Sequence, residues 1–214
     1  MAVRADRGMP LQNRVTPFGD LVAVPSRGLF MGNRGGRFHT DAKGLTARRW
    51  ASRQWICCVL DFKGRHRDVW GRFYTELFFL DELTALAAGH RPCFECRRQD
   101  ALAFAARWRT AFRLKARPHA DAMDAVLHQE RLHGRAKRLH RRSVDALPDG
   151  AFIATEEGAF AVRGKSLLHW TPDAYDACRP ISRGTTVDVL TPPAILAILS
   201  AGYQPHWHPS AACF

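Results

Sequence analysis

The sequence predicts an α+β fold, and three observations support this prediction. Short segments rich in β-branched and aromatic residues alternate with glycine-containing turns near both ends of the chain. Two middle segments are helix-like: 98–113 is amphipathic, and 121–141 starts with acidic and ends with basic residues. Just before them, a short helix runs into Cys93-x-x-Cys96. We therefore expect a small antiparallel hairpin with a helix and a Cys-x-x-Cys turn, two further helices, and a C-terminal antiparallel meander with a terminal helix.

The N-terminal part of the chain predicts an arm, two strands and a turn. Residues 1–13 are polar and arginine-containing, as in a disordered arm. Segments 20–24 and 28–31 have strand character and are joined by a proline-containing turn. Residues 32–39 contain three glycines and two arginines, a pattern found much more often in turns between strands than in phosphate sites.

The predicted hairpin contains two adjacent cysteines. Segment 55–62 alternates and is rich in β-forming residues, and segment 72–80 is expected to return beside it as the second strand. Successive side chains of a strand point to opposite faces, so Cys57 and Cys58 should lie on opposite sides of the sheet. Only one of them can readily serve as a metal ligand.

The helix after the hairpin has clear start and stop signals. The Asp81 carboxylate can accept from free amides of the first turn, and Gly89 can end the helix in the left-handed conformation. Pro92 prevents the helix from resuming. Cys93 and Cys96 follow at a spacing that lets both thiolates bind one zinc ion.

This region resembles the zinc-binding domain of the bacterial Ada alkylation-response protein. The resemblance covers about residues 55–100 and rests on Ala-Ala-Gly-His-Arg-Pro-Cys-Phe-Glu-Cys-Arg at 87–97, preceded by the strand-like segment 74–80. It implies that Cys93 and Cys96 are the last two of four zinc ligands. In that family the upstream cysteine pair is separated by three residues, whereas Cys57 and Cys58 are adjacent here. The pattern that supplies the family's methyl-accepting cysteine is therefore absent.

The remaining zinc ligands stay open at the level of sequence. One of the two adjacent cysteines and a histidine, either His66 or His90, are the expected candidates. We expect a structural zinc, because several thiolate ligands leave no obvious position for a reactive water. The candidate ligands are Cys93, Cys96, Cys58, Cys57, His66 and His90.

The C-terminal part predicts a separate small module. The turn 147–150 suggests a boundary, which divides the chain into the arm 1–13, an Ada-like zinc-knuckle and helical domain 14–146, and a strand-rich module 147–214. Within that module, short strands are expected at 151–155, 159–162, 166–169 and 185–190. A terminal helix should begin near Pro192, which suits the first helical position, and end at Gly202.

Charge indicates the class of partner. The 214 residues carry a net charge of +12, which favours nucleic acid, either DNA or RNA. Segment 107–142 has eleven basic and three acidic side chains, a net charge of +8. Its predicted nucleic-acid-binding residues include Arg131, Arg135, Lys137, Arg138, Arg141 and Arg142.

These observations predict a zinc-containing, basic nucleic-acid-binding protein, with a link to DNA repair or regulation suggested by the resemblance. One alternative is a nucleic-acid-processing enzyme, a nuclease or modification enzyme, that uses His39, His66 or the polar cluster at 169–178. A second alternative is a non-catalytic assembly or regulatory factor with a protein partner. No apolar run of spanning length and no signal peptide is evident, so we expect a cytoplasmic protein that does not bind membranes.

Overall fold

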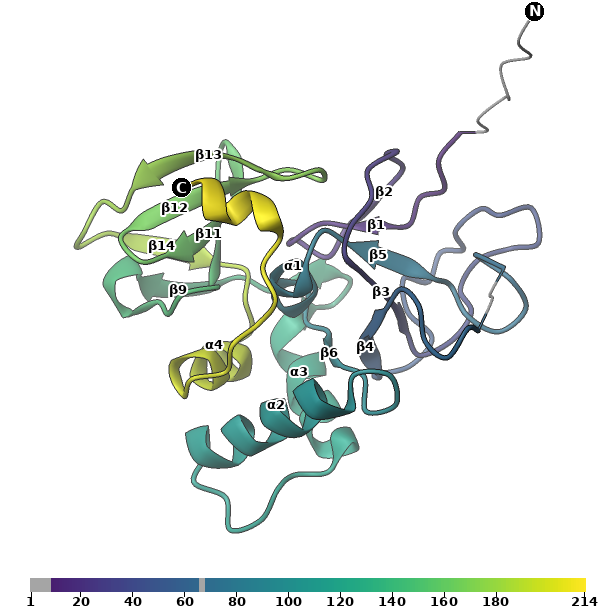
Figure 1. Ribbon diagram of the computed structural model, residues 1–214, viewed down its shortest axis with the longest axis horizontal. Helices are drawn as coiled ribbons and strands as arrows, with labels where there is room; N and C mark the ends of the chain where they lie inside the picture. The colour runs from purple at the N-terminus through teal and green to yellow at the C-terminus, as the bar shows by residue number, and fades with distance from the viewer. Residues whose placement is uncertain (1–8, 66–67) are drawn as a thin grey trace, which may run out of the picture.

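The computed structural model describes residues 9–65 and 68–214. In these residues it contains two six-stranded sheets, a two-stranded ribbon and four α-helices (Figure 1). This confirms the α+β class, with more sheet than helix. The expected arm lies outside the described residues up to residue 8, and Asn13 at its end is buried.

The first sheet places a strand from the N-terminal third at its centre. Its order is β2-β1-β5-β3-β4-β6. The strands are β1 (Arg14–Val15), β2 (Leu21–Val22), β3 (Phe30–Arg34), β4 (Trp55–Val59), β5 (Leu77–Phe79) and β6 (Arg91–Pro92). The expected hairpin between segments 55–62 and 72–80 is therefore wrong, because β3 lies between β4 and β5 and pairs antiparallel with both.

Gly32 at the centre of β3 makes this close pairing possible. A Cβ atom at this position would lie 2.1 Å from the Ile56 carbonyl oxygen on one neighbouring strand and 2.8 Å from the Phe79 ring on the other. Only a residue without a side chain fits between the two strands.

Helix α1 (Glu82–Ala87) lies between the two sheets (Figure 1). Its predicted signals are confirmed: the Asp81 carboxylate accepts from the Thr84 amide at 2.8 Å, and Gly89 follows the helix with φ +87°. Ala85 and Ala88 pack into the core of the first sheet, whereas Leu83 and Ala87 pack into the core of the second. The helix is thus shared by both halves of the molecule.

The other three helices form a layer of their own. Helices α2 (Arg98–Ala111), α3 (Ala120–Arg131) and α4 (Pro193–Ser200) meet in one apolar cluster. The cluster consists of Leu86, Phe104, Ala105, Trp108, Met123, Leu127, Ala194, Ile195, Ile198, Leu199 and Tyr203. The helix expected at 98–113 is confirmed, with its end at residue 111.

The helix expected at 121–141 ends ten residues early. After Arg131 the chain forms a ribbon of β7 (Leu132–His133) and β8 (Ala136–Lys137), with Gly134 in its turn at φ +62°. Residues 140–143 then form β9 (His140–Ser143), which pairs with the second sheet. The basic residues after 131 therefore extend from strands and turns.

The second sheet is antiparallel throughout, with the order β13-β12-β11-β10-β14-β9. Its other strands are β10 (Phe152–Thr155), β11 (Gly158–Arg163), β12 (Ser166–Trp170), β13 (Tyr175–Pro180) and β14 (Thr186–Val189). The predicted meander is confirmed for β10 to β12. Strand β13 was not predicted, because its residues 176–178 are exposed and lack an apolar repeat.

The module boundary expected at 147 stays a prediction, although β9 precedes it and belongs to the second sheet. None of the helices in residues 9–65 and 68–214 has the length and apolar character needed to cross a membrane.

Candidate metal centre

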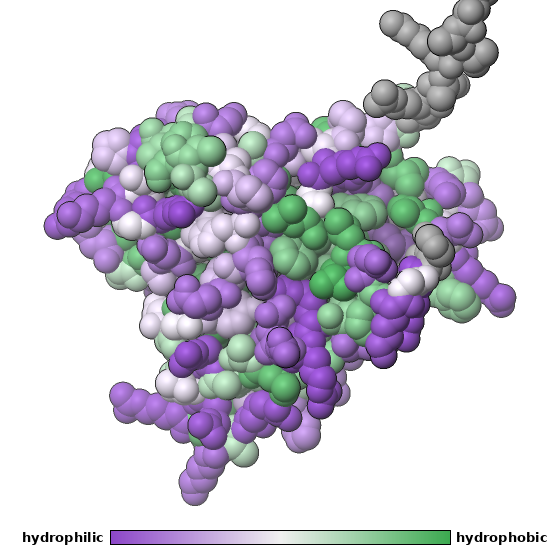
Figure 2. Space-filling model, viewed as in Figure 1, coloured by the Kyte–Doolittle hydropathy of each residue, from purple (hydrophilic) through white to green (hydrophobic). Residues whose placement is uncertain are grey.

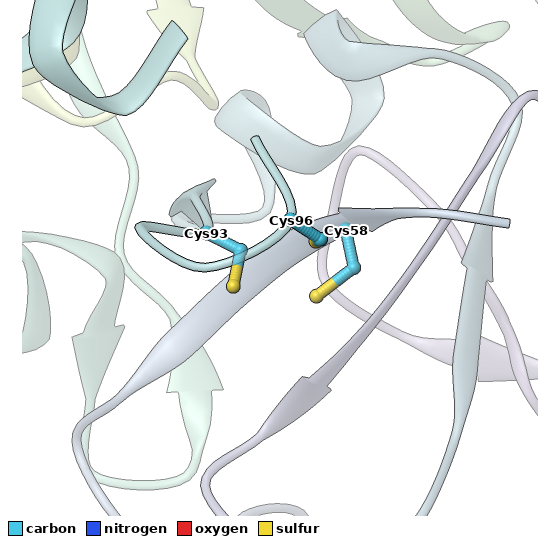
Figure 3. A group of neighbouring side chains, drawn as sticks. All are labelled: Cys58, Cys93 and Cys96. Carbon is cyan, nitrogen blue, oxygen red and sulfur yellow. The ribbon is translucent and has the colours of Figure 1, made fainter. Parts of the chain in front are cut away.

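Three cysteines from two separate segments, β4 and the Cys-x-x-Cys turn, converge in the first sheet. The Sγ atoms of Cys58, Cys93 and Cys96 all lie within 4.8 Å of one another (Figure 3). Cys58 belongs to β4, whereas Cys93 directly follows β6. Strand β6 runs parallel to β4, and the Cys93 amide donates to the Cys57 carbonyl at 2.9 Å. Because of this pairing, the start of the Cys-x-x-Cys turn lies next to the side chain of Cys58. We call these three residues the three-thiol cluster.

The two adjacent cysteines point to opposite faces of β4, as the sequence predicted. Cys57 is fully buried in the apolar core of the first sheet, and its Sγ atom lies 3.4 Å from Nη1 of Arg97. Burial raises the pKa of the Cys57 thiol well above its ordinary value. Cys57 is therefore a core residue, and Cys58 is the one positioned to bind a metal.

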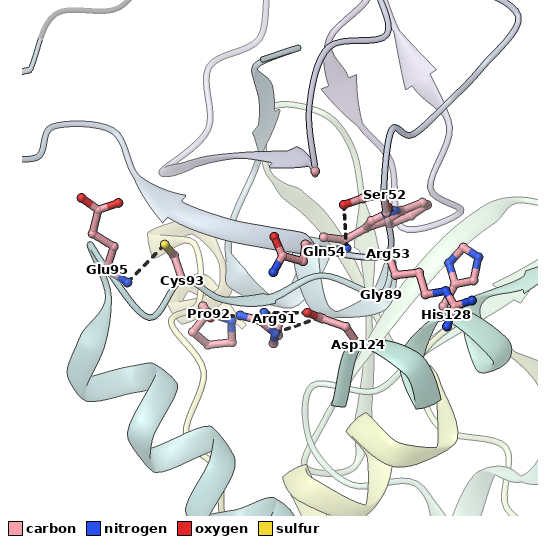
Figure 4. A network of polar contacts seen from close by, with 12 residues as sticks. Ser52, Arg53, Gln54, Gly89, Arg91, Pro92, Cys93, Glu95, Asp124 and His128 are labelled. Atoms are coloured by element: carbon pink, nitrogen blue, oxygen red, sulfur yellow. Dashed lines mark hydrogen bonds and ion pairs between the residues drawn. The ribbon is translucent and has the colours of Figure 1, made fainter. Parts of the chain in front are cut away.

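Hydrogen bonds favour negative charge on the sulfur of Cys93, whereas the pKa values of Cys58 and Cys96 are raised, mainly through their interactions with the neighbouring thiols. The Glu95 amide donates to Cys93 Sγ at 3.4 Å (Figure 4). Hydrogen bonds from the Cys58 and Cys96 thiols lower the pKa of Cys93. Metal binding requires thiolates, and a tetrahedral site with metal–sulfur distances near 2.3 Å separates its sulfurs by roughly 3.8 Å. The cluster could thus hold a metal ion after a small contraction.

Two buried ion pairs hold the turn in place. Arg91 in β6 binds Asp124 of α3 through two contacts, Nε to Oδ1 at 2.9 Å and Nη2 to Oδ2 at 2.7 Å (Figure 4). Arg97, just after the turn, binds Glu82 of α1 at 2.8 Å. The turn is therefore fixed on both sides to helices of the core.

The histidine candidates do not join the cluster in the described residues. His90 is fully buried against Trp55 and Phe79, and Arg34 Nε donates to its Nε2 at 3.3 Å. Burial lowers the pKa of His90, so the ring stays neutral. His66 lies outside the described residues. Among the described residues, the cluster consists of three cysteines and no fourth His, Cys, Asp or Glu.

A pocket opens beside the three-thiol cluster. Its volume is about 310 Å³, and its lining includes all three cysteines, the polar side chains of Asn33 and Glu76, and several apolar residues of the first sheet. Glu76 is held by the backbone amide of Trp70 at 2.7 Å. The three cysteines would hold a metal ion beside this pocket.

The six predicted nucleic-acid-binding residues do not form one surface. Arg135, Arg138, Arg141 and Arg142 are exposed. Arg131 is only 1% exposed and donates to the Gly89 and Arg53 carbonyls. The Lys137 ammonium group points inward and donates to the Ala87 carbonyl. Arg131 and Lys137 are thus interior cations, which the local excess of positive charge could not reveal.

The histidines of the enzyme alternative lie in two different settings. His39 is buried, with Nδ1 at 2.7 Å from Thr75 Oγ1 and Nε2 at 3.1 Å from the Gly71 carbonyl. His169 forms a pair with Asp176, whose Oδ1 lies 2.7 Å from Nδ1. This pair joins β12 and β13 of the second sheet, whereas the three-thiol cluster belongs to the first sheet.

Comparisons of the chain with family models, curated proteins and solved structures give no match.

Proposed function

We propose that this chain is a zinc-containing, basic nucleic-acid-binding protein, in which zinc stabilises the fold. The observation that carries the proposal is the convergence of Cys58 with Cys93 and Cys96. Thiolate donors suit zinc, and a turn closed by two cysteines is typical of structural zinc sites. The resemblance of residues 55–100 to the Ada zinc-binding domain supports the same metal and suggests a role in DNA repair or regulation.

Nucleic acid is the partner that the charge supports best. The exposed basic residues around the α2–α3 end and β9 are Arg107, Arg109, Arg113, Lys115, Arg117, Arg135, Arg138, Arg141 and Arg142. Figure 2 shows hydrophilic side chains projecting from the end of the molecule formed by α2 and the loop that follows it. In the described residues, the one ion pair among these nine cations is the loose contact of Arg141 with Asp188 at 3.9 Å. The positive charge of the others, including Arg138, whose Nε donates to the Leu132 carbonyl at 3.0 Å, is not neutralised by an acid in these residues and can attract phosphates.

The test is a salt titration of binding to duplex DNA and to structured RNA. Each contacted phosphate releases counterions, so the slope of log affinity against log salt should fall by about one for each contacting residue removed. We expect the triple replacement to reduce the slope by about three, with little change in base preference. The replaced residues are Arg138, Arg141 and Arg142, each changed to Gln.

A matched control separates this surface from net charge. Arg27, Arg72 and Arg183 are exposed residues of other segments, and replacing them by Gln removes the same charge. The control variant should keep the wild-type slope. Equal losses of slope in both variants, or none in either, would remove nucleic-acid contact from β9 and its flank.

The pocket beside the three-thiol cluster favours a second candidate, a nucleic-acid-processing enzyme. Catalytic zinc sites keep one position open, and the position of the three cysteines beside a pocket of about 310 Å³ supports this candidate. The two functions differ in turnover. Conversion of many DNA or RNA molecules per zinc-loaded protein would establish the enzyme, whereas binding without conversion supports the structural zinc.

A further inference from the structure

A second pocket of this protein is lined by cations. It has a volume of about 290 Å³ and lies around Trp55, at the start of β4. Its basic lining residues come from three separate stretches of the chain: Arg34, Arg49, and Arg131, Arg135 and Lys137. We call this site the cation pocket.

The floor of the cation pocket is a stack of three side chains. The guanidinium groups of Arg34 and Arg131 each lie 3.9 Å from the centre of a Trp55 ring. All three residues are at most 2% exposed. Stacking on an indole holds a guanidinium in place and leaves its in-plane N–H groups available as donors.

The three inner cations are held by neutral groups. Arg34 donates to the Gly19 carbonyl at 2.8 Å, Arg131 donates to the Gly89 carbonyl at 2.9 Å, and Lys137 donates to the Ala87 carbonyl. None of the three forms an ion pair with a carboxylate within the described parts of the chain. The acid that lines the pocket, Asp20, is an exposed residue.

One hydrogen-bond donor of these cations is also unpaired. Nε of Arg131 is buried and has no hydrogen-bond partner in the part of the chain that the structure describes. A buried donor without a partner costs about 1–3 kcal/mol, and more when it is charged. Three buried cations without a carboxylate partner are costly to the fold unless an anion enters the site.

The shifted pKa values of these groups are consistent with that cost. Burial, together with the neighbouring cations, lowers the pKa of Lys137 from 10.5 to about 7. Burial likewise lowers the pKa of Arg34 and of Arg131 to about 9. The surroundings of each group therefore contain too little negative charge to stabilise its charged form fully.

We propose that the cation pocket binds a phosphate group. Two guanidiniums and an ammonium converging in one cleft match a phosphate, which offers several acceptor oxygens and up to two negative charges. The half-buried Trp50 at the same pocket offers an aromatic face for a base. The phosphate can belong to a mononucleotide or to the end of a nucleic-acid strand, or it can be free. This inference rests neither on zinc nor on the exposed arginines of β9.

The alternative is a purely structural stack that binds no ligand. The variants Lys137→Gln and Arg49→Gln distinguish the two, because each removes a cation from the pocket without touching the Trp55 stack. Arg49 is exposed, so its variant is expected to fold even if the Lys137 variant is less stable. Arg183→Gln, outside the pocket, is the matched control.

The measurement is calorimetric titration of the whole protein with inorganic phosphate, with AMP, and with a single-stranded oligonucleotide that carries a 5′-phosphate or a 5′-hydroxyl. We expect phosphate to bind the wild type and the control alike, and each pocket variant to bind about tenfold or more weakly. No binding of any phosphate beyond the effect of sodium chloride at equal ionic strength would overturn the proposal. Unchanged affinity in both pocket variants would overturn it as well.

The arms of the titration identify the source of the phosphate. Tighter binding of the 5′-phosphorylated strand than of its 5′-hydroxyl twin assigns the pocket to strand ends, whereas tighter binding of AMP assigns it to mononucleotides. Both results support the pocket. Because zinc content and the salt slope on duplex DNA are measured separately, failure here is distinguishable from failure of the proposed function.

Discussion

At the scale of single residues, the adjacent cysteines show which property the sequence predicts and which it does not. Strand alternation predicts that Cys57 and Cys58 face opposite ways, and they do. The choice between them depends on which face of β4 meets the core and which meets the Cys-x-x-Cys turn. Those partners are Leu77 and Ala85 on one side and Cys93 on the other, all distant in sequence. Strand character alone therefore leaves the ligand undecided.

This assignment predicts the effect of each cysteine on zinc content. Freshly purified protein should contain about one zinc per chain. Cys58→Ser should lose the metal and lower the melting temperature, because structural zinc contributes free energy of folding. Cys57→Ser changes a core atom only and should keep the metal.

Elemental analysis of both variants, with melting curves in the presence and absence of a chelator, checks this prediction. The prediction is contradicted if wild-type protein contains no zinc and its melting temperature is the same with and without the chelator. In that case the three-thiol cluster is not a zinc site. Equal loss of zinc in both variants would contradict the assignment of Cys58.

The burial of the interior arginines could not be predicted from the sequence. An arginine in a basic segment is normally exposed, so Arg131 was predicted as a surface residue. Its burial depends on Trp55 and on carbonyl groups of Arg53 and Gly89, which reach it from other parts of the chain. Nothing in the local sequence encodes that environment.

At the scale of elements, predictions held where the signals were local. Helix α1 was located correctly because Asp81 and Gly89 act within a few residues of the helix itself. Helix α3 ends at Arg131 because that side chain is drawn into the core and Gly134 forms the turn of the next ribbon. The hairpin was wrong because β3, placed between β4 and β5, is some twenty residues or more away from both.

Two glycines offer a matched test of what a side chain beside Arg131 costs the fold. Gly89 and Gly134 both have positive φ, and any side chain there costs about 1 kcal/mol. At Gly89 a Cβ would also lie 2.6 Å from Cδ of Arg131, whereas at Gly134 no atom lies within 4 Å in the described residues. Gly89→Ala should therefore lower the free energy of unfolding by about 2 kcal/mol more than Gly134→Ala. Urea denaturation measures both, and equal losses would show that Arg131 can move aside freely.

At the scale of the whole molecule, two buried carboxylates join the halves of the chain. Asp81 accepts from the Tyr175 hydroxyl at 2.8 Å and from the His208 amide at 3.1 Å. Glu82 accepts from the Tyr203 hydroxyl at 2.7 Å and from the His206 amide at 3.0 Å. The start of α1 is thus bonded to the second sheet and to the segment after α4. The two sheets should unfold together.

Removing one of these donors tests that coupling. Tyr203→Phe leaves Glu82 with one donor fewer in a buried site and should lower the free energy of unfolding by about 1–3 kcal/mol. Tyr74→Phe, at a side chain that is 41% exposed, is the control and should change it little. Far-ultraviolet and near-ultraviolet circular dichroism should follow one transition in both variants. Two separate transitions would show that the halves are independent.

The same pair of carboxylates sets an order of events during synthesis. The amide that completes the shell of Asp81 belongs to His208, 127 residues later. At about 5–20 residues per second, the ribosome takes roughly 6–25 s to add that stretch. Throughout this interval the carboxylates of α1 lack their final hydrogen-bond donors. The first sheet is synthesised before the second, but we expect it to complete its packing against α1 only when the second sheet is also present. The protein should reach its native state only after residue 208 has left the ribosome.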